Sequence, residues 1–233
     1  MKSTKMIEPK KIVENRALWD HLHEQLRFRP VYPNENVVRF IMRNFQKVIL
    51  KQDGIKTLDL GVGGGRHTKL LCELGFNVFG LDISMNGLNH TRKRIANDNL
   101  TVDLTQASMI QLPFKKCSFD AIISYGVFNY GNQIEMQTAI QEVHRILRPN
   151  GKAFVMLRTT DDYRFGKGEQ LEPNTFILKI RETNEYGTIQ HFLDEKAVRE
   201  YFSAFSKLEF ERTETTFMQL EAVNSDWLIT VEK

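Results

Sequence analysis

Short apolar runs alternate with amphipathic stretches of helix length through the middle of the chain, from residue 56 to residue 157. Apolar runs of this length predict buried strands, and the stretches between them predict helices. Such alternation is typical of a parallel sheet covered by helices on both faces, so we expect an α/β fold of the Rossmann-like kind. The predicted strands are Lys56–Leu60, Asn77–Leu81, Thr101–Gln106, Phe119–Ser124 and Lys152–Leu157.

After Leu157 the alternation stops, and residues 158–193 are polar and contain several glycines. Within them, the segments TFILKI and TIQHF are expected to pair across a turn around Asn184 to Gly187, which predicts an inserted flap. Asp194 is expected to cap a helix, and two strands should follow near Leu208–Phe217 and Asp226–Val231. The chain should therefore end in an antiparallel strand pair, which brings the mostly parallel main sheet to seven strands.

The first fifty residues have a helical pattern. Asn34 is placed to cap a helix in which Val37, Val38, Ile41 and Phe45 recur at helical spacing. We expect residues 1–50 to form a helical cap over the functional site, and residues 51–233 to form one domain that carries the flap.

Composition and charge narrow the classes of function. The chain has 233 residues and a net charge of +3, with its basic residues dispersed, so we do not expect nucleic acid as a partner. The two cysteines, Cys72 and Cys117, are far apart, which indicates neither a disulfide framework nor a metal site. We expect a cytoplasmic protein without a membrane span, because no apolar run approaches the roughly 18 residues that a span needs. The sequence does not indicate an oligomeric state.

The segment LDLGVGGGRHT places a glycine-rich loop directly after the first predicted strand. Gly61, Gly63 and Gly65 permit tight turns and close approach of a ligand to the backbone at the carboxyl edge of the sheet. Asp82 ends the next strand, 21 residues after Gly61, where its carboxylate could accept hydrogen bonds from both hydroxyls of a ribose. These residues predict a site for a ligand that contains a nucleoside. A dinucleotide fingerprint would need glycine or alanine at position 66, where this chain has Arg66, so NAD is the weaker alternative.

Four segments in order resemble the motifs of class I S-adenosylmethionine-dependent methyltransferases of the small-molecule type. They are LDLGVGGGRHT, GLDIS, ASMIQLPFKKCSFDAIIS and VHRILRPNGK, and the resemblance covers residues 56–157. It implies S-adenosylmethionine as cofactor and methyl transfer as the reaction. It also implies that Ser108 occupies a position where the family usually has an acid, and a hydroxyl without charge should bind the adenine amino group more weakly. The cofactor-binding residues that the resemblance implies are Asp59, Gly61, Gly63, Gly65, Asp82, Ile83, Ser108, Met109, Tyr125 and Gly126.

The acceptor is expected to be a small molecule, either sugar-like or anionic, because arginines and tyrosines gather near the predicted sheet edge. A hydroxyl acceptor would also need a base, and His191 on the flap is the candidate. His67, at the start of the helix after the glycine-rich loop, is the other imidazole available, and it could instead help to frame the cofactor. Methyl transfer to protein or RNA, and cofactor binding without catalysis, remain alternatives. The predicted acceptor-binding residues are Tyr32, Asn129, Tyr130, Arg158, Tyr163 and Arg164, with Arg27 and Arg29 nearby.

Overall fold

The computed structural model describes residues 9–26, 29–51, 54–181, 183 and 185–233. Within these residues the main sheet has seven strands in the order β3-β2-β1-β4-β5-β10-β9. The first five strands run parallel to their neighbours, whereas β10 is antiparallel to both β5 and β9. The predicted Rossmann-like sheet with its C-terminal antiparallel pair is confirmed. The strands are β1 (Lys56–Leu60), β2 (Asn77–Asp82), β3 (Asp103–Gln106), β4 (Phe119–Tyr125), β5 (Leu147–Arg158), β9 (Lys207–Phe217) and β10 (Ala222–Glu232).

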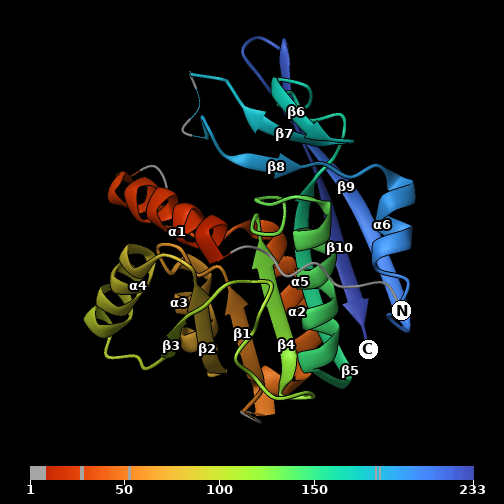
Figure 1. The fold of residues 1–233 in the computed structure, drawn as a ribbon. Coiled ribbons are helices and arrows are strands. Elements are labelled where there is room, and N and C mark those ends of the chain that lie inside the picture. The colour runs from red at the N-terminus through yellow and green to blue at the C-terminus, as the bar shows by residue number, and fades with distance from the viewer. Residues whose placement is uncertain (1–8, 27–28, 52–53, 182, 184) are drawn as a thin grey trace.

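Helices cover both faces of this sheet (Figure 1). On one face, α5 and α6 bury Met136, Val143 and Phe202 against Ile122 and Val155. On the other face, α2 and α3 pack on a second apolar cluster. Burial on both faces explains why the central strands are almost continuously apolar. The helices are α1 (Pro9–Glu24), α2 (Glu35–Lys51), α3 (Arg66–Glu73), α4 (Met85–Asn97), α5 (Gln133–Ile146) and α6 (Glu195–Tyr201).

The second helix belongs to the main body of the molecule. Its residues Val37, Phe40 and Ile41 are buried against Ile123 and Phe154 of the sheet. The expectation that residues 1–50 form a cap is therefore wrong for α2, because its apolar stripe needs the sheet face to be removed from water. Of the helices before β1, only α1 lies near the carboxyl ends of the parallel strands (Figure 1).

Local signals at helix starts are borne out by hydrogen bonds. The side chain of Asp194 accepts the Ala197 N–H at 2.7 Å, so the predicted cap of α6 is confirmed. Asn132 and Glu135 form a reciprocal capping box at the start of α5. The described helices include none that is long and apolar enough to cross a membrane.

The flap is a separate three-stranded sheet made of β6 (Gly168–Glu172), β7 (Thr175–Leu178) and β8 (Ile189–His191). Strands β7 and β8 pair antiparallel, as the sequence predicts for TFILKI and TIQHF. The sequence does not predict β6, a mostly exposed and polar strand that lacks an apolar alternation. Part of the predicted turn, at Asn184, lies outside the described residues. This small sheet and α1 both lie beyond the carboxyl ends of β1 and β4 (Figure 1).

Candidate active site

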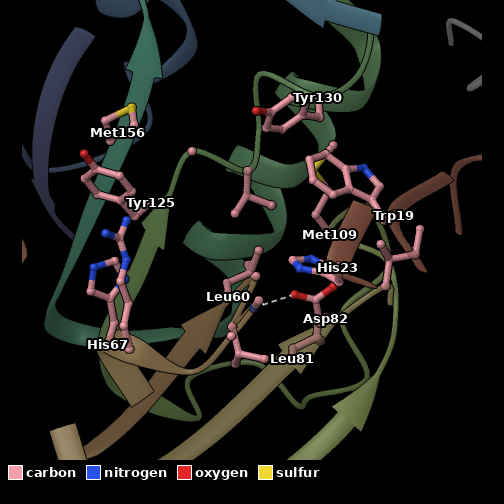
Figure 2. Close-up of a pocket in the computed structure, with 18 of the residues that line it drawn as sticks. Trp19, His23, Leu60, His67, Leu81, Asp82, Met109, Tyr125, Tyr130 and Met156 are labelled. Atoms are coloured by element: carbon pink, nitrogen blue, oxygen red, sulfur yellow. Dashed lines mark hydrogen bonds between the residues drawn. The ribbon is translucent and has the colours of Figure 1, made fainter. Parts of the chain in front are cut away.

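A cavity of about 330 Å³ opens at the carboxyl edge of the main sheet. Its wall includes the last residues of four parallel strands, namely Leu60, Asp82, Tyr125 and Arg158. The volume lies in the range of sites for small molecules and cofactors. Figure 2 shows Trp19, His23 and Asp82 along one side of this cavity, and His67, Tyr125 and Met156 along the other.

Asp82 is fixed in the cavity wall by the backbone around it. Its Oδ2 accepts the Gly63 N–H and its Oδ1 accepts the Ser84 N–H, both at 2.8 Å. Burial raises the pKa of Asp82, whereas His23 and the backbone donors oppose that shift. The Ile83 N–H also contributes a backbone hydrogen bond to this carboxylate, whose two oxygens offer about four acceptor sites in all. The side chain is therefore held in one orientation and retains capacity to bind hydroxyl groups of a ligand.

The glycine-rich loop takes backbone conformations that only glycine adopts easily. Gly61, Gly63 and Gly65 all have positive φ, at 83°, 50° and 78°. A Cβ atom on Gly61 would lie 2.2 Å from Cγ2 of Val127, so this position requires glycine for packing within the protein. Gly61 and Gly63 line the cavity. Gly65 does not, because it turns the chain into α3 against Thr91.

Asp59, predicted to touch the cofactor, is not in the cavity wall. It is buried beneath the loop, where the Thr68 hydroxyl donates to its Oδ2 at 2.6 Å. Burial raises the pKa of Asp59 to about 6, and the hydrogen bond from Thr68 opposes that shift. Asp59 therefore joins β1 to the first turn of α3 and supports the loop from below.

The remaining predicted cofactor residues all line the cavity. Ile83 and Ser108 follow the ends of β2 and β3, and Met109 lies next to Ser108. Tyr125 ends β4, and Gly126, which has a φ of 67°, follows it. The structure thus gathers residues from three of the four motifs, LDLGVGGGRHT, GLDIS and ASMIQLPFKKCSFDAIIS, around one cavity.

The two residues directly after the glycine loop, Arg66 and His67, also line the cavity, and His67 is the second imidazole that the sequence offers as a base. The Arg66 guanidinium lies 5.2 Å from the Tyr125 ring centre. His67 is buried, and its Nε2 accepts the Asn34 N–H at 3.2 Å. Burial lowers the pKa of His67 to about 3, with a further contribution from Arg66, so its imidazole is neutral at physiological pH. Arg66 has no salt bridge with a carboxylate among the described residues.

Helix α1 supplies a side of the cavity that sequence reasoning missed. Trp19 and His23 both line the cavity. Their spacing of four residues places them on one helix face, and this is the signal that could have indicated them. The Trp19 ring also contacts the Tyr130 ring edge-on, with ring centres 4.6 Å apart. Residues of α1 and of the loop after β4 therefore meet across the cavity.

Tyr130 and Arg158, both predicted to bind the acceptor, also line the cavity. Each contacts Glu185, which lies in the segment between β7 and β8. Glu185 has no recognisable signal in the sequence, because it stands among other polar residues of the flap. The buried carboxylate of Glu185 thereby connects the flap to the cavity wall.

The structure places the predicted base, His191, outside the cavity wall. Its side chain is buried, and its Nδ1 lies 2.7 Å from Oγ1 of Thr175. The Tyr201 ring is stacked on the His191 imidazole, with the two ring centres 6.3 Å apart. Burial lowers the pKa of His191 to about 4, although Glu172 opposes that shift. These contacts give His191 a structural role between β7, β8 and α6.

Other predicted acceptor residues also lie away from the cavity wall. Tyr32 is 82% exposed, and Asn129 is buried with no hydrogen bond to its side chain from the described residues. Arg164 is paired with Asp162 and Glu185, and the Tyr163 ring packs on the Arg164 guanidinium. The predicted Arg29 contacts His90, and Arg27 lies outside the described residues.

Metal ligation has no candidate in the part of the chain that the structure describes, where no group of three or more histidine, cysteine or acidic side chains gathers.

Comparison with known proteins matches the central part of the chain to a family. Residues 58–155 match the model of the methyltransferase domain. Over 147 residues the chain is 31% identical to a ubiquinone biosynthesis O-methyltransferase from Pelagibacter ubique, covering 62% of this chain and 59% of that protein. It is 34% identical over 103 residues to a demethylmenaquinone methyltransferase from Clavibacter sepedonicus, covering 44% of this chain and 40% of that protein. The chain thus spans about half the length of these curated relatives.

Solved structures extend the likeness beyond the matched domain. A SAM-dependent methyltransferase from Methanosarcina mazei superimposes with a TM-score of 0.65 at 20% identity, covering 80% of this chain and 96% of that one. The 1,6-didemethyltoxoflavin-N1-methyltransferase of Burkholderia thailandensis gives 0.62 at 14% identity, covering 100% of this chain and 93% of that one. The resemblance of the motifs is confirmed: residues 58–155 are a methyltransferase domain, and the chain has the class I S-adenosylmethionine-dependent methyltransferase fold.

Proposed function

We propose that this chain binds S-adenosylmethionine in the cavity and transfers its methyl group to a small-molecule acceptor. One observation supports this most directly. The carboxylate of Asp82 is held by the N–H groups of Gly63 and Ser84 and lines the cavity beside the glycine-rich loop. A fixed carboxylate at the carboxyl edge of a Rossmann-like sheet suits the two hydroxyls of a ribose.

The residues present fit the cofactor at both of its polar ends. Asp82 would hold the ribose, and Ile83, Ser108 and Met109 would border the adenine. Arg66, which has no salt bridge to a described carboxylate and interacts with Asp59 only at longer range, would pair with the carboxylate of the methionine moiety. A guanidinium in a partly enclosed cavity favours such a partner, because a charge-assisted hydrogen bond offsets the cost of its burial.

When bound, S-adenosylmethionine supplies an electrophilic methyl group on its sulfonium. The task of the protein is then to hold an acceptor in line with that methyl group and to exclude water. We propose that α1 takes part by covering the cavity with Trp19 and His23, and that Tyr130 and Arg158 border the acceptor. We do not retain His191 as a base, since its ring is buried against Thr175 and Tyr201.

The part of the cavity around Tyr130 and Arg158, which we call the acceptor end, suits a ring-shaped molecule. Its wall contains Trp19, Tyr125 and Tyr130, together with Met156 and Val127. Aromatic side chains offer flat apolar faces on which an aromatic or sugar ring can pack. The proteins that this chain resembles are named for ubiquinone, demethylmenaquinone and didemethyltoxoflavin, and these names support a small ring compound as acceptor.

Two measurements test the proposal against its alternatives. A thermal unfolding series should show S-adenosylmethionine and S-adenosylhomocysteine raising the Tm, and NAD leaving it unchanged. Incubation with methyl-labelled cofactor and a cell extract should then place the label in the small-molecule fraction. Label in protein or RNA would favour a macromolecular acceptor, and binding without any transfer would favour a non-catalytic cofactor-binding module.

A further inference from the structure

Glu185 is the centre of a buried polar network behind the acceptor end of the cavity. Its Oε1 accepts from Arg158 Nη2 at 2.6 Å and from the Tyr130 hydroxyl at 2.5 Å. Its Oε2 accepts from Arg164 Nε at 2.7 Å. The side chains of Arg158 and Glu185 are only 11% and 10% exposed. The three donors thus surround one carboxylate that water hardly reaches.

This network leaves no excess positive charge near Arg158. Arg164 is also paired with the fully buried carboxylate of Asp162 at 2.9 Å. Asp226 lies directly opposite Arg158 in the register of β5 and β10. Burial raises the pKa of Asp226 to about 6, an effect that Arg158 opposes, so the group is mostly ionised at neutral pH. Two guanidinium groups are therefore balanced by the carboxylates of Glu185 and Asp162 before Asp226 is counted.

Only part of this network faces the cavity. Tyr130 and Arg158 line the cavity, whereas Glu185 does not. The tyrosine hydroxyl points its proton at Glu185, and burial raises the pKa of Tyr130, so the phenol stays neutral. Burial alone would raise the pKa of Glu185, but Arg158 and Arg164 outweigh it and lower that pKa to about 2. Glu185 therefore remains an anion at every pH at which the protein would work.

An anionic acceptor would have to compete with Glu185 for the Arg158 guanidinium. Displacing Glu185 would leave a buried carboxylate short of partners, and this costs more than the new ion pair returns. Arg66 provides the contrast within the same cavity, since it has no salt bridge to a described carboxylate. The expectation of an anionic acceptor assumed that Arg158 and Arg164 were available, and both are already paired.

We infer that Glu185 is a specificity-determining residue, which makes the acceptor end of the cavity select a ring compound that is uncharged where it meets Arg158 and Tyr130. The inference rests on the proposed function, because it assumes that this end of the cavity receives the acceptor. Glu185 acts through Arg158 and Tyr130, so it is a positioning residue and not a catalytic one.

Benzamide and benzoate test this, because they have nearly the same shape and differ in charge. Both are titrated against the wild-type chain by ligand-observed NMR, with and without S-adenosylhomocysteine. We expect the wild type to bind benzamide about tenfold more tightly than benzoate, and Glu185→Gln to shift the preference toward benzoate about tenfold by removing the carboxylate paired with Arg158. Glu169→Gln is the control, since Glu169 is an exposed residue of the same flap that is paired with Lys179.

The wild-type preference does not depend on whether Glu185→Gln folds, and the Tm of the variant reports its folding separately. Tighter binding of benzoate by the wild type, binding of neither probe, or an unchanged preference in folded Glu185→Gln overturns the inference. Failure of S-adenosylhomocysteine to bind, with the benzamide preference intact, contradicts the proposed function and leaves the charge selectivity in place.

Discussion

The role of Arg66 can be assigned only in the folded chain. In the sequence it argues against a dinucleotide fingerprint, whereas in the structure its guanidinium enters the cavity beside Tyr125. The methionine carboxylate of the proposed cofactor is the group that would compensate its charge. The residue is therefore expected to recognise one end of the ligand and not the adenosine.

We predict that Arg66→Gln weakens binding of S-adenosylhomocysteine by about 1.5–3 kcal/mol, the usual contribution of a hydrogen bond to a charged group. Binding of 5′-methylthioadenosine, which lacks the carboxylate, should not change. Calorimetric titration of both ligands measures this difference. Arg92→Gln serves as control, because Arg92 is an exposed residue of α4 that contacts Asn89. Equal losses for the two ligands would contradict the assignment.

The burial of His191 predicts an effect on the pH dependence of stability, and not on catalysis. Its pKa is about 4 in the folded chain because it is buried, against 6.5 when exposed. Between these values the unfolded chain binds more protons, so the free energy of unfolding should fall as the pH falls from 6.5 to 4. Above pH 6.5 the protonation of His191 no longer affects the free energy of unfolding. As the pH falls from 6.5 to 4, this group lowers that free energy by up to about 3 kcal/mol.

Chemical denaturation of the wild type and His191→Gln at several pH values checks this effect. The variant should unfold with a smaller pH dependence over that interval, whereas His21→Gln, at an exposed position of α1, should behave like the wild type. A variant with the unchanged pH dependence but a large loss of turnover would return His191 to a catalytic role.

Among the elements, α1 has a clear consequence for ligand exchange. It contributes Trp19 and His23 to the cavity wall, and Trp19 contacts Tyr130 from the loop after β4. This contact joins the helix to the opposite side of the cavity. Opening of the cavity on this side would have to break that contact.

We predict that Trp19→Ala speeds the release of S-adenosylhomocysteine about tenfold or more, since truncating a well-packed aromatic residue acts mainly on the dissociation rate. Stopped-flow displacement measures that rate. Trp19→Phe keeps an aromatic ring against Tyr130 and should restore most of the slow release. An unchanged rate in Trp19→Ala would show that α1 does not retain the ligand.

Elements with a strong local pattern could be predicted from the sequence, and elements set by distant packing could not. The run Lys56–Leu60 forms β1 with the predicted bounds, and Asp194 caps α6 as predicted. The face that α2 covers could not be foreseen, because an amphipathic stripe does not say which apolar surface receives it. Strand β6 was missed because its exposed residues lack the apolar alternation that marks a buried strand.

At the scale of the whole molecule, the strand order explains which half of the site was predictable. Order β2-β1-β4 brings the loop after β1, Asp82 and Tyr125 to one edge, as expected for a Rossmann-like sheet. The acceptor half instead combines Trp19 of α1 with Arg158 of β5, and it depends on Glu185 of the flap. These three residues come from segments whose relative position no local pattern encodes, so sequence reasoning found Arg158 and missed the other two.

The most direct test is to remove the two ribose hydroxyls from the ligand and the carboxylate from the protein in turn. Calorimetry compares S-adenosylhomocysteine with its 2′,3′-dideoxy analogue on the wild type, on Asp82→Ala and on Asp103→Ala, a control at the exposed start of β3. We predict that loss of the hydroxyls costs the wild type and the control about 1–3 kcal/mol, and costs Asp82→Ala almost nothing. The same loss in all three proteins, or no loss in the wild type, would contradict the assignment of this cavity to an adenosyl cofactor held at Asp82.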